Sequence, residues 1–182
     1  MVSYEQEYFT SEGYDEYYDF PAHVIRVDRI ISMTNPRSVL DIGCAYGYIV
    51  RRLLDRGVYA VGLDISKWCE VQAKRIIPGH FIRHDLTKPL PFNDKVFDLL
   101  YCVGVLEHIS ESEIDRIMFE FERVARQRMF QIAFPSYPDA SKTSGHICLH
   151  NPEWWINRMP FQSWLFAEDR GIENGCLWYY KG

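Results

Sequence analysis

The sequence lacks several features that are typical of particular classes of protein, and each absence excludes one class. It has no apolar run near the roughly 20 residues that a membrane-crossing helix requires. Its first seven residues carry neither a basic patch nor an apolar stretch. We therefore expect no secretory signal, no membrane partner and a cytoplasmic location. The five cysteines are scattered and form no CxxC pair, so neither a zinc knuckle nor a disulfide framework is expected.

Positive charge is also scarce. The 182 residues include 20 Lys and Arg against 25 Asp and Glu, which gives a net charge of -5. The acidic excess is local, because residues 1–25 contain six acids and no Lys or Arg, and the remainder is almost neutral. A chain with this charge distribution is unlike proteins whose positively charged surface binds the phosphates of nucleic acids. The composition therefore predicts that nucleic acid is not the partner of this protein.

Helical and strand patterns alternate along most of the chain. Helical spacing of apolar residues occurs in 23–33 and 48–55, in 66–74, and after an S-x-x-E capping box at Ser110 and Glu113. Seven short apolar segments predict strands, and no helix-length segment separates the last two, which predicts a hairpin. We expect an α/β fold, Rossmann-like and doubly wound, with a mostly parallel seven-stranded sheet and a C-terminal antiparallel hairpin. The expected strands are 39–41, 59–64, 80–83, 97–102, 129–134, 163–167 and 176–180.

Acidic residues follow the first three predicted strands, at the sheet edge where parallel sheets bind ligands. The first strand ends in Asp41-Ile42-Gly43-Cys44-Ala45-Tyr46-Gly47, whose glycines permit a tight turn. The second ends in Asp64, a carboxylate that can accept both hydroxyls of a ribose. The third is followed by Asp85 and Leu86, which can bind an adenine. Each residue alone has an ordinary structural explanation, but the three strand ends together describe an adenosine.

Motifs that are absent narrow the choice of adenosine compound. A dinucleotide site would read G-x-G-x-x-G and a P-loop would end in Gly-Lys-Ser/Thr, and neither occurs. The glycine turn instead follows Asp41, an acid that can pair with an ammonium group. A ligand that combines an ammonium, a carboxylate and an adenosine is S-adenosylmethionine.

The same segments resemble the motifs of class I S-adenosylmethionine-dependent methyltransferases. Residues 39–47 look like the first motif of that family and 61–66 like its second, while 84–109 contain stretches similar to the rest of its cofactor half. Ala45 stands where the family usually has a middle glycine. The resemblance implies S-adenosyl-L-methionine as cofactor, S-adenosyl-L-homocysteine as product and no metal. It implies cofactor contacts from Asp41, Gly43, Cys44, Gly47, Asp64, Ile65, Asp85, Leu86, Cys102 and Val103.

The methyl acceptor is less well defined by the sequence. Methyl transfer from a sulfonium relies mostly on positioning, so a general base is needed only when the acceptor must lose a proton early. His108 and His146 are the candidate catalytic residues, and each also has an ordinary structural explanation. An aromatic N-terminal segment predicts a lid over the site. Expected substrate contacts are Tyr14, Tyr17, Tyr18 and His150.

We expect one domain over residues 1–182. It consists of an N-terminal lid and helix (1–35), a cofactor-binding core (37–134), and an acceptor-side segment with the terminal hairpin (135–182). The expected activity is methyl transfer to oxygen or nitrogen of a small molecule, such as a sugar or natural product, by a monomer or homodimer. Three alternatives stay open: an RNA or protein methyltransferase that acts with a partner, a cofactor-binding protein without transferase activity, and a nicotinamide-dependent oxidoreductase.

Overall fold

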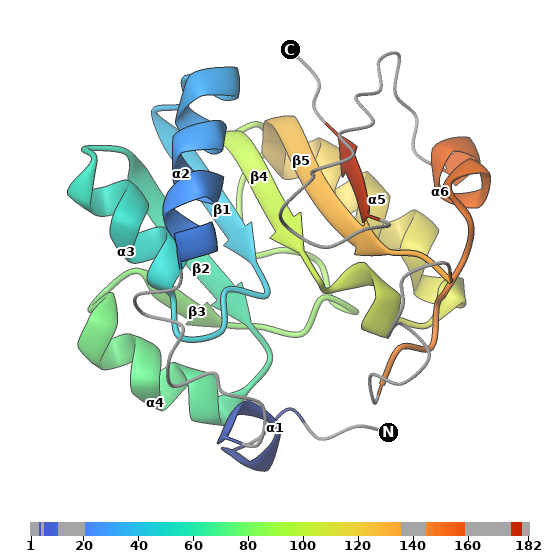
Figure 1. The fold of residues 1–182 in the computed structure, drawn as a ribbon, viewed down its shortest axis with the longest axis horizontal. Coiled ribbons are helices and arrows are strands. Elements are labelled where there is room, and N and C mark those ends of the chain that lie inside the picture. The colour runs from blue at the N-terminus through green and yellow to red at the C-terminus, as the bar shows by residue number, and fades with distance from the viewer. Residues whose placement is uncertain (1–3, 5, 11–20, 136–144, 159–175, 180–182) are drawn as a thin grey trace.

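The centre of the molecule is a six-stranded sheet in the described part of the chain (Figure 1). The computed structural model describes residues 4, 6–10, 21–135, 145–158 and 176–179. Five strands are β1 (Ser38–Ile42), β2 (Tyr59–Asp64), β3 (Phe81–Arg83), β4 (Phe97–Val103) and β5 (Ala125–Ala133), and the sixth is β6 (Cys176–Tyr179).

The strand order is β3-β2-β1-β4-β5-β6. The first five strands are mutually parallel, and β6 runs antiparallel to β5, with Ala133 opposite Cys176. The prediction of a mostly parallel, doubly wound sheet is therefore confirmed. The prediction of seven strands with a terminal hairpin is wrong for the described sheet, which has six strands and whose antiparallel edge strand β6 pairs with β5. The expected strand 163–167 lies outside the described residues.

Helices cover both faces of the sheet (Figure 1). Apolar residues of α2 (Pro21–Thr34), α3 (Tyr48–Asp55) and α4 (Lys67–Ile76) share one core cluster with the sheet. Residues of α5 (Glu111–Val124) and α6 (Pro152–Arg158) share the other. The shorter helices are α1 (Gln6–Thr10) and the 3-10 turn η2 (Leu106–His108).

Alternation along β4 decides which side chains reach which face. Leu99 and Tyr101 belong to the cluster under α2 and α3, whereas Leu100 and Cys102 belong to the cluster under α5. This period of two is the normal geometry of a strand. This alternation therefore places Tyr101 and Cys102, at the end of β4, on opposite faces of the sheet.

The helix starts are partly as predicted. The Ser66 hydroxyl caps α4 by accepting the backbone N–H of Cys69 at 3.1 Å, as expected. The capping box at α5 is wrong, because the Ser110 hydroxyl lies 3.0 Å from that of Ser112 and makes no cap. Among the described residues, no helix is long and apolar enough to span a bilayer.

Candidate functional site

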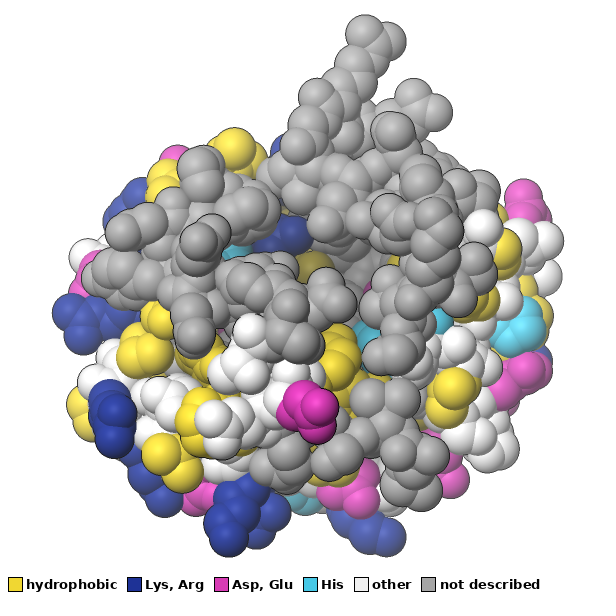
Figure 2. All heavy atoms as spheres, turned by 60° about the horizontal axis from the view of Figure 1, so that its bottom comes forward, with side chains coloured by type: hydrophobic (Ala, Val, Ile, Leu, Met, Phe, Trp, Pro, Cys, Tyr) yellow, Lys and Arg dark blue, Asp and Glu magenta, His cyan; other side chains and the backbone are white. Residues whose placement is uncertain are grey.

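A cavity of about 320 Å³ opens at the carboxyl ends of β1, β2 and β4. This volume falls in the range of small-molecule sites, roughly 300–1,000 Å³. β1 pairs with both β2 and β4, so the chain reverses its direction of winding there, and open α/β sheets bind ligands at such a switch point. Figure 2 turns this edge of the sheet toward the viewer and shows histidine side chains at the centre and at the right, among other places on the surface.

The loop between β1 and α3 forms one wall of the cavity. Gly43 has φ +69°, and a Cβ there would lie 2.2 Å from the Val105 side chain. Gly47 has φ +85°, and its Cβ would lie 2.3 Å from the Ile77 side chain. Both positions need glycine for backbone conformation and for space. The loop can therefore pass close to a ligand and to the loop after β4.

Ala45 takes the left-handed conformation that a glycine would adopt without strain, with φ +47°. Its backbone N–H donates to Oδ2 of Asp64 at 3.0 Å, and the N–H of Ser66 donates to Oδ1 at 2.9 Å. The Asp64 carboxylate thus ties the loop after β1 to the loop after β2. Burial raises the pKa of Asp64, although these hydrogen bonds oppose the increase.

The inner end of the cavity holds polar groups without matching partners. Asp41 is 4% exposed and Tyr101 is 2% exposed, and both line the cavity. Burial, and then the charge of Asp64, raise the pKa of Asp41 to about 8, while Arg26 opposes the increase. The Tyr101 hydroxyl and Arg26 Nε have no hydrogen-bond partner among the described residues. Buried polar groups are rarely left unsatisfied, so this end fits a polar ligand.

The groups at this end suit the two charges of an amino acid. Asp41 offers a carboxylate to an ammonium group, and Arg26 offers a guanidinium to a carboxylate. Neither Arg26 nor Tyr101 was predicted from the sequence. A tyrosine within the otherwise apolar run 99–103 was the one available signal, because a polar tip in a buried strand needs a partner.

The opposite end of the cavity is formed by the segment after β3. His84, Asp85 and Leu86 line it, together with Ile65 and Ile109. Oδ1 of Asp85 accepts the backbone N–H of Thr87 at 2.8 Å. Burial raises the pKa of Asp85, but hydrogen bonds from Thr87 outweigh this effect and lower it. Asp85 is therefore ionised at neutral pH and can accept hydrogen bonds.

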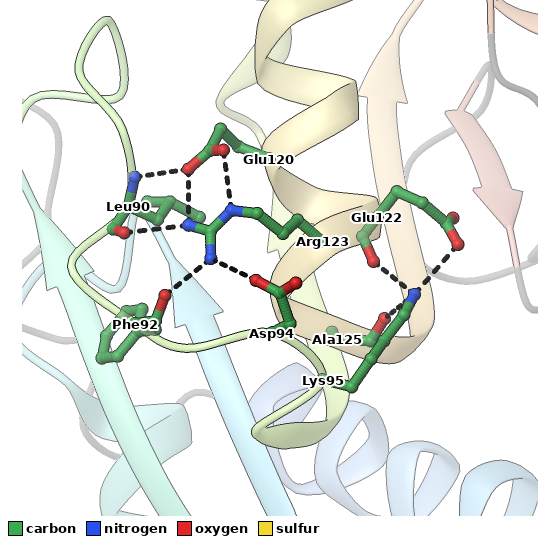
Figure 3. A network of polar contacts seen from close by, with 8 residues as sticks. All are labelled: Leu90, Phe92, Asp94, Lys95, Glu120, Glu122, Arg123 and Ala125. Carbon is green, nitrogen blue, oxygen red and sulfur yellow. Dashed lines mark hydrogen bonds and ion pairs between the residues drawn. The ribbon is translucent and has the colours of Figure 1, made fainter.

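Arginines of α5 hold this segment in place. Arg116 donates to the carbonyl oxygen of Leu86 at 2.7 Å. Figure 3 shows Arg123 donating to the carbonyl oxygens of Leu90 and Phe92, at 3.0 and 2.7 Å, and pairing with Glu120. Lys95 likewise donates to the Glu122 carboxylate and to the carbonyl oxygen of Ala125. The position of the predicted adenine-binding residues therefore depends on α5.

Most of the expected cofactor residues lie around this one cavity, and two do not. The lining includes Asp41, Gly43, Cys44, Asp64, Ile65, Asp85, Leu86 and Val103. Gly47 is not part of the lining and shapes the turn instead. Cys102 is also absent from it, because strand alternation places it in the core on the α5 side, 1% exposed. Tyr101 and Val103 line the cavity on either side of it in the sequence.

The expected acceptor-side residues separate in the structure. His108 lines the cavity, and His146 packs on it with ring centroids 4.6 Å apart. His150 lies elsewhere, because its ring stacks on Trp154 at 3.8 Å and its Nε2 lies 3.0 Å from a Glu111 oxygen. His150 thus attaches α6 to α5. Tyr14, Tyr17 and Tyr18 lie outside the described residues.

The fold and the cavity define an α/β protein with a small-molecule-sized cavity at its switch point. Residues 39–128 match a family model described as a methyltransferase domain. A tRNA U34 carboxymethyltransferase from Shewanella sp. (strain W3-18-1) is 39% identical over 100 residues, which cover 51% of this chain and 30% of the relative. The chain therefore matches less than a third of the length of that relative.

Solved structures share the fold. A SAM-dependent methyltransferase from Archaeoglobus fulgidus superposes with TM-score 0.66 at 17% identity, over 82% of this chain and 73% of that one. A Haloferax volcanii methyltransferase in complex with the activator Trm112 superposes with TM-score 0.65 at 16% identity, over 83% of this chain and 72% of that one. Residues 39–128 therefore form a methyltransferase domain, and the chain has the fold of S-adenosylmethionine-dependent methyltransferases.

The expectation of a small-molecule acceptor with no nucleic acid partner is wrong. Several curated relatives are named as tRNA-modifying enzymes, and the Haloferax neighbour is in complex with a protein activator. Net charge misled because it describes the chain as a whole. In relatives several times longer than the matched segment, charge that holds nucleic acid can lie outside this domain.

Proposed function

We propose that the enzyme transfers a methyl group from S-adenosylmethionine to a nucleobase of RNA and acts with a partner protein. The observation that carries this proposal is the match to relatives named as tRNA-modifying enzymes, over 40–51% of this chain and 26–30% of theirs. The chain carries a methyltransferase domain over residues 39–128 and does not match most of the length of these relatives. Arg26 is the only Lys or Arg among the described lining residues, and it lies at the inner end near Asp41. We therefore assign phosphate binding to the partner.

In this proposal the cavity residues hold the cofactor at three points. Asp41, Arg26 and the Tyr101 hydroxyl hold the amino acid end, and Asp64 accepts the ribose hydroxyls. Asp85 and Leu86 bind the adenine. When bound, S-adenosylmethionine supplies an electrophilic methyl group on a positively charged sulfur. Gly43 leaves the space in which the ligand lies against the backbone.

The test is methyl transfer to RNA. Tagged protein isolated gently from its native host, which retains a bound partner, is compared with protein made in a heterologous bacterium. Both are incubated with tritiated S-adenosylmethionine and total bacterial tRNA, and the labelled nucleosides are identified by mass spectrometry. We expect label in tRNA, with higher turnover for the host preparation. Label in no RNA, from two preparations that both bind S-adenosylmethionine, would contradict the proposal.

A further inference from the structure

Aromatic rings from three separate segments meet beside the cavity. The ring of Tyr4 lies edge-on to Tyr8 at 5.2 Å and to His108 at 5.6 Å, and His108 in turn contacts His146 at 4.6 Å. Tyr4, Tyr8 and His108 all line the cavity. We call these four residues the aromatic wall. Three of its residues belong to the lining of the cavity, and His146 packs behind His108.

The tautomer of His108 follows from its hydrogen bond. Its Nδ1 lies 3.1 Å from the carbonyl oxygen of Gly145, which can only accept, so Nδ1 carries the hydrogen. Burial, and then the nearby His146, lower the pKa of His108 to about 4, so the ring is neutral at pH 7. Nε2 therefore carries a lone pair. No described residue donates a hydrogen bond to it.

The support beneath His108 is rigid. The carbonyl oxygen of the preceding residue, Glu107, accepts the backbone N–H groups of Ile147 and Cys148 at 2.9 and 3.0 Å. Oε1 of Glu107 accepts the N–H of Ala133, at the end of β5, at 3.2 Å. These bonds connect η2, the segment 145–148 and the sheet. A fixed support is what positioning of a reacting group requires.

We propose that the aromatic wall holds the planar acceptor base: Tyr4 stacks on the ring, and Nε2 of His108 accepts the proton of its reacting O–H or N–H. This inference rests on the proposed RNA function and names the residues that carry it out. The acceptor atom forms a bond to the methyl carbon, and the carbon–sulfur bond breaks with its electron pair going to sulfur. The proton passes to Nε2 of His108 and from there to solvent.

The chemistry of the wall favours a neutral flat ring over a charged acceptor. Burial, and then Tyr8, raise the pKa of Tyr4 to about 12, so its phenol stays protonated. His108 is neutral as well, so neither it nor Tyr4 carries a charge that could pair with a lysine or carboxylate acceptor. Unstacked bases bind in this way, with faces on aromatic side chains and edges on hydrogen-bonding groups.

The test uses variants that separate stacking, proton acceptance and cofactor binding. Tyr4→Ala should raise the KM for tRNA about 5- to 150-fold, which corresponds to roughly 1–3 kcal/mol of base stacking, and Tyr4→Phe should keep most of the affinity. His108→Asn retains a donor for Gly145 but removes the Nε2 acceptor, and should lower kcat about 100-fold or more. His108→Gln places an acceptor nearer to Nε2 and should recover part of kcat. The Kd for S-adenosylhomocysteine should stay within about twofold in all four variants.

Tyr59→Ala is the matched control, because Tyr59 is 54% exposed at the start of β2, the end of the sheet opposite the cavity. Its KM and kcat should equal those of the wild type. A rise in the cofactor Kd on Tyr4→Ala, with KM for tRNA unchanged, would show that Tyr4 covers the cofactor and would overturn the stacking role. An unchanged kcat in His108→Asn would overturn the role of His108.

A second arm separates this inference from the proposed function. Uridine monophosphate is titrated into the complex with S-adenosylhomocysteine and followed by saturation-transfer NMR. Binding that is lost in Tyr4→Ala supports the base site even if the wild type methylates no RNA, which would overturn the RNA function alone. Methylated RNA with wild-type kinetics in the Tyr4 and His108 variants would overturn the base site alone.

Discussion

Replacing Asp41 by asparagine should make the enzyme more stable and, at the same time, a weaker binder of S-adenosylmethionine. Asp41 lies at the end of β1, 4% exposed, and no described residue hydrogen-bonds to its carboxylate. Burial and the neighbouring Asp64 raise its pKa from 3.8 to about 8. A buried carboxyl group with a raised pKa lowers the free energy of unfolding of the ligand-free protein at neutral pH. It becomes useful when a cationic group of a ligand pairs with it.

The magnitude follows from proton linkage. The folded protein keeps the Asp41 proton at pH values where the unfolded chain has lost it, so this contribution to stability is complete below pH 3.8. It is lost as the pH rises toward 8. pH 7 is about three units above the pKa of Asp41 in the unfolded chain, so the stability lost through this group at pH 7 is at most about 4 kcal/mol. Asparagine has nearly the same shape and no such penalty.

The assay is urea unfolding of the ligand-free protein at pH 5 and pH 7.5, with calorimetric titration of S-adenosylmethionine in parallel. Asp41→Asn should gain stability mainly at pH 7.5 and lose cofactor affinity. Asp98→Asn is the control of opposite sign. Burial raises the pKa of Asp98, but the backbone hydrogen bond and charge of Arg37 lower it overall, so this variant should lose stability at neutral pH. A less stable Asp41→Asn variant at pH 7.5, or one with wild-type affinity, would refute the reasoning.

Three further predictions concern the walls of the cavity. Ala45→Gly should raise the free energy of unfolding by about 1 kcal/mol, because alanine at φ +47° is strained, and a decrease in urea unfolding would contradict this. Arg123→Lys should lower stability by about 2 kcal/mol, because lysine cannot reproduce the fork to Glu120 and two carbonyls, and an unchanged unfolding midpoint would count against it. Asp64→Asn should weaken binding of S-adenosylhomocysteine by about 1–3 kcal/mol in calorimetry, whereas Asp55→Asn on the surface of α3 should not.

The sequence alone was sufficient to predict the site residues that directly follow the consecutive parallel strands. Asp41, Asp64 and Asp85 could be grouped because parallel strands end at one edge, and this rule needs no tertiary detail. Arg26 could not be placed in this way, because it lies within α2 and approaches the site only through packing of that helix over the sheet. Cys102 lies in the core between Tyr101 and Val103, which line the cavity, because successive residues of a strand face opposite sides of the sheet.

The acceptor side was harder to predict for a different reason. His108 and His146 were both candidates, and only the hydrogen bond to Gly145 and the cavity lining distinguish them. Tyr4 was missed because it lies in the same aromatic N-terminal segment as Tyr14, Tyr17 and Tyr18, and the sequence does not show which of these tyrosines reaches the cavity. His150 lies next to the start of α6, where it stacks on the nearby Trp154 and also contacts Glu111, which is distant in the sequence. Long-range contacts of this kind leave no periodic signal in a sequence.

The central claim is that the cavity at the ends of β1, β2 and β4 binds S-adenosylmethionine through Asp41. Calorimetric titration with S-adenosylhomocysteine at pH 7, in two buffers of different ionisation enthalpy, tests it most directly. The account predicts a single site and the release of close to one proton per ligand, because Asp41 with a pKa of about 8 is mostly protonated before binding. Asp41→Asn should release none. Folded protein that is free of co-purified ligand and gives no binding heat, or binds with no proton released, would contradict the claim.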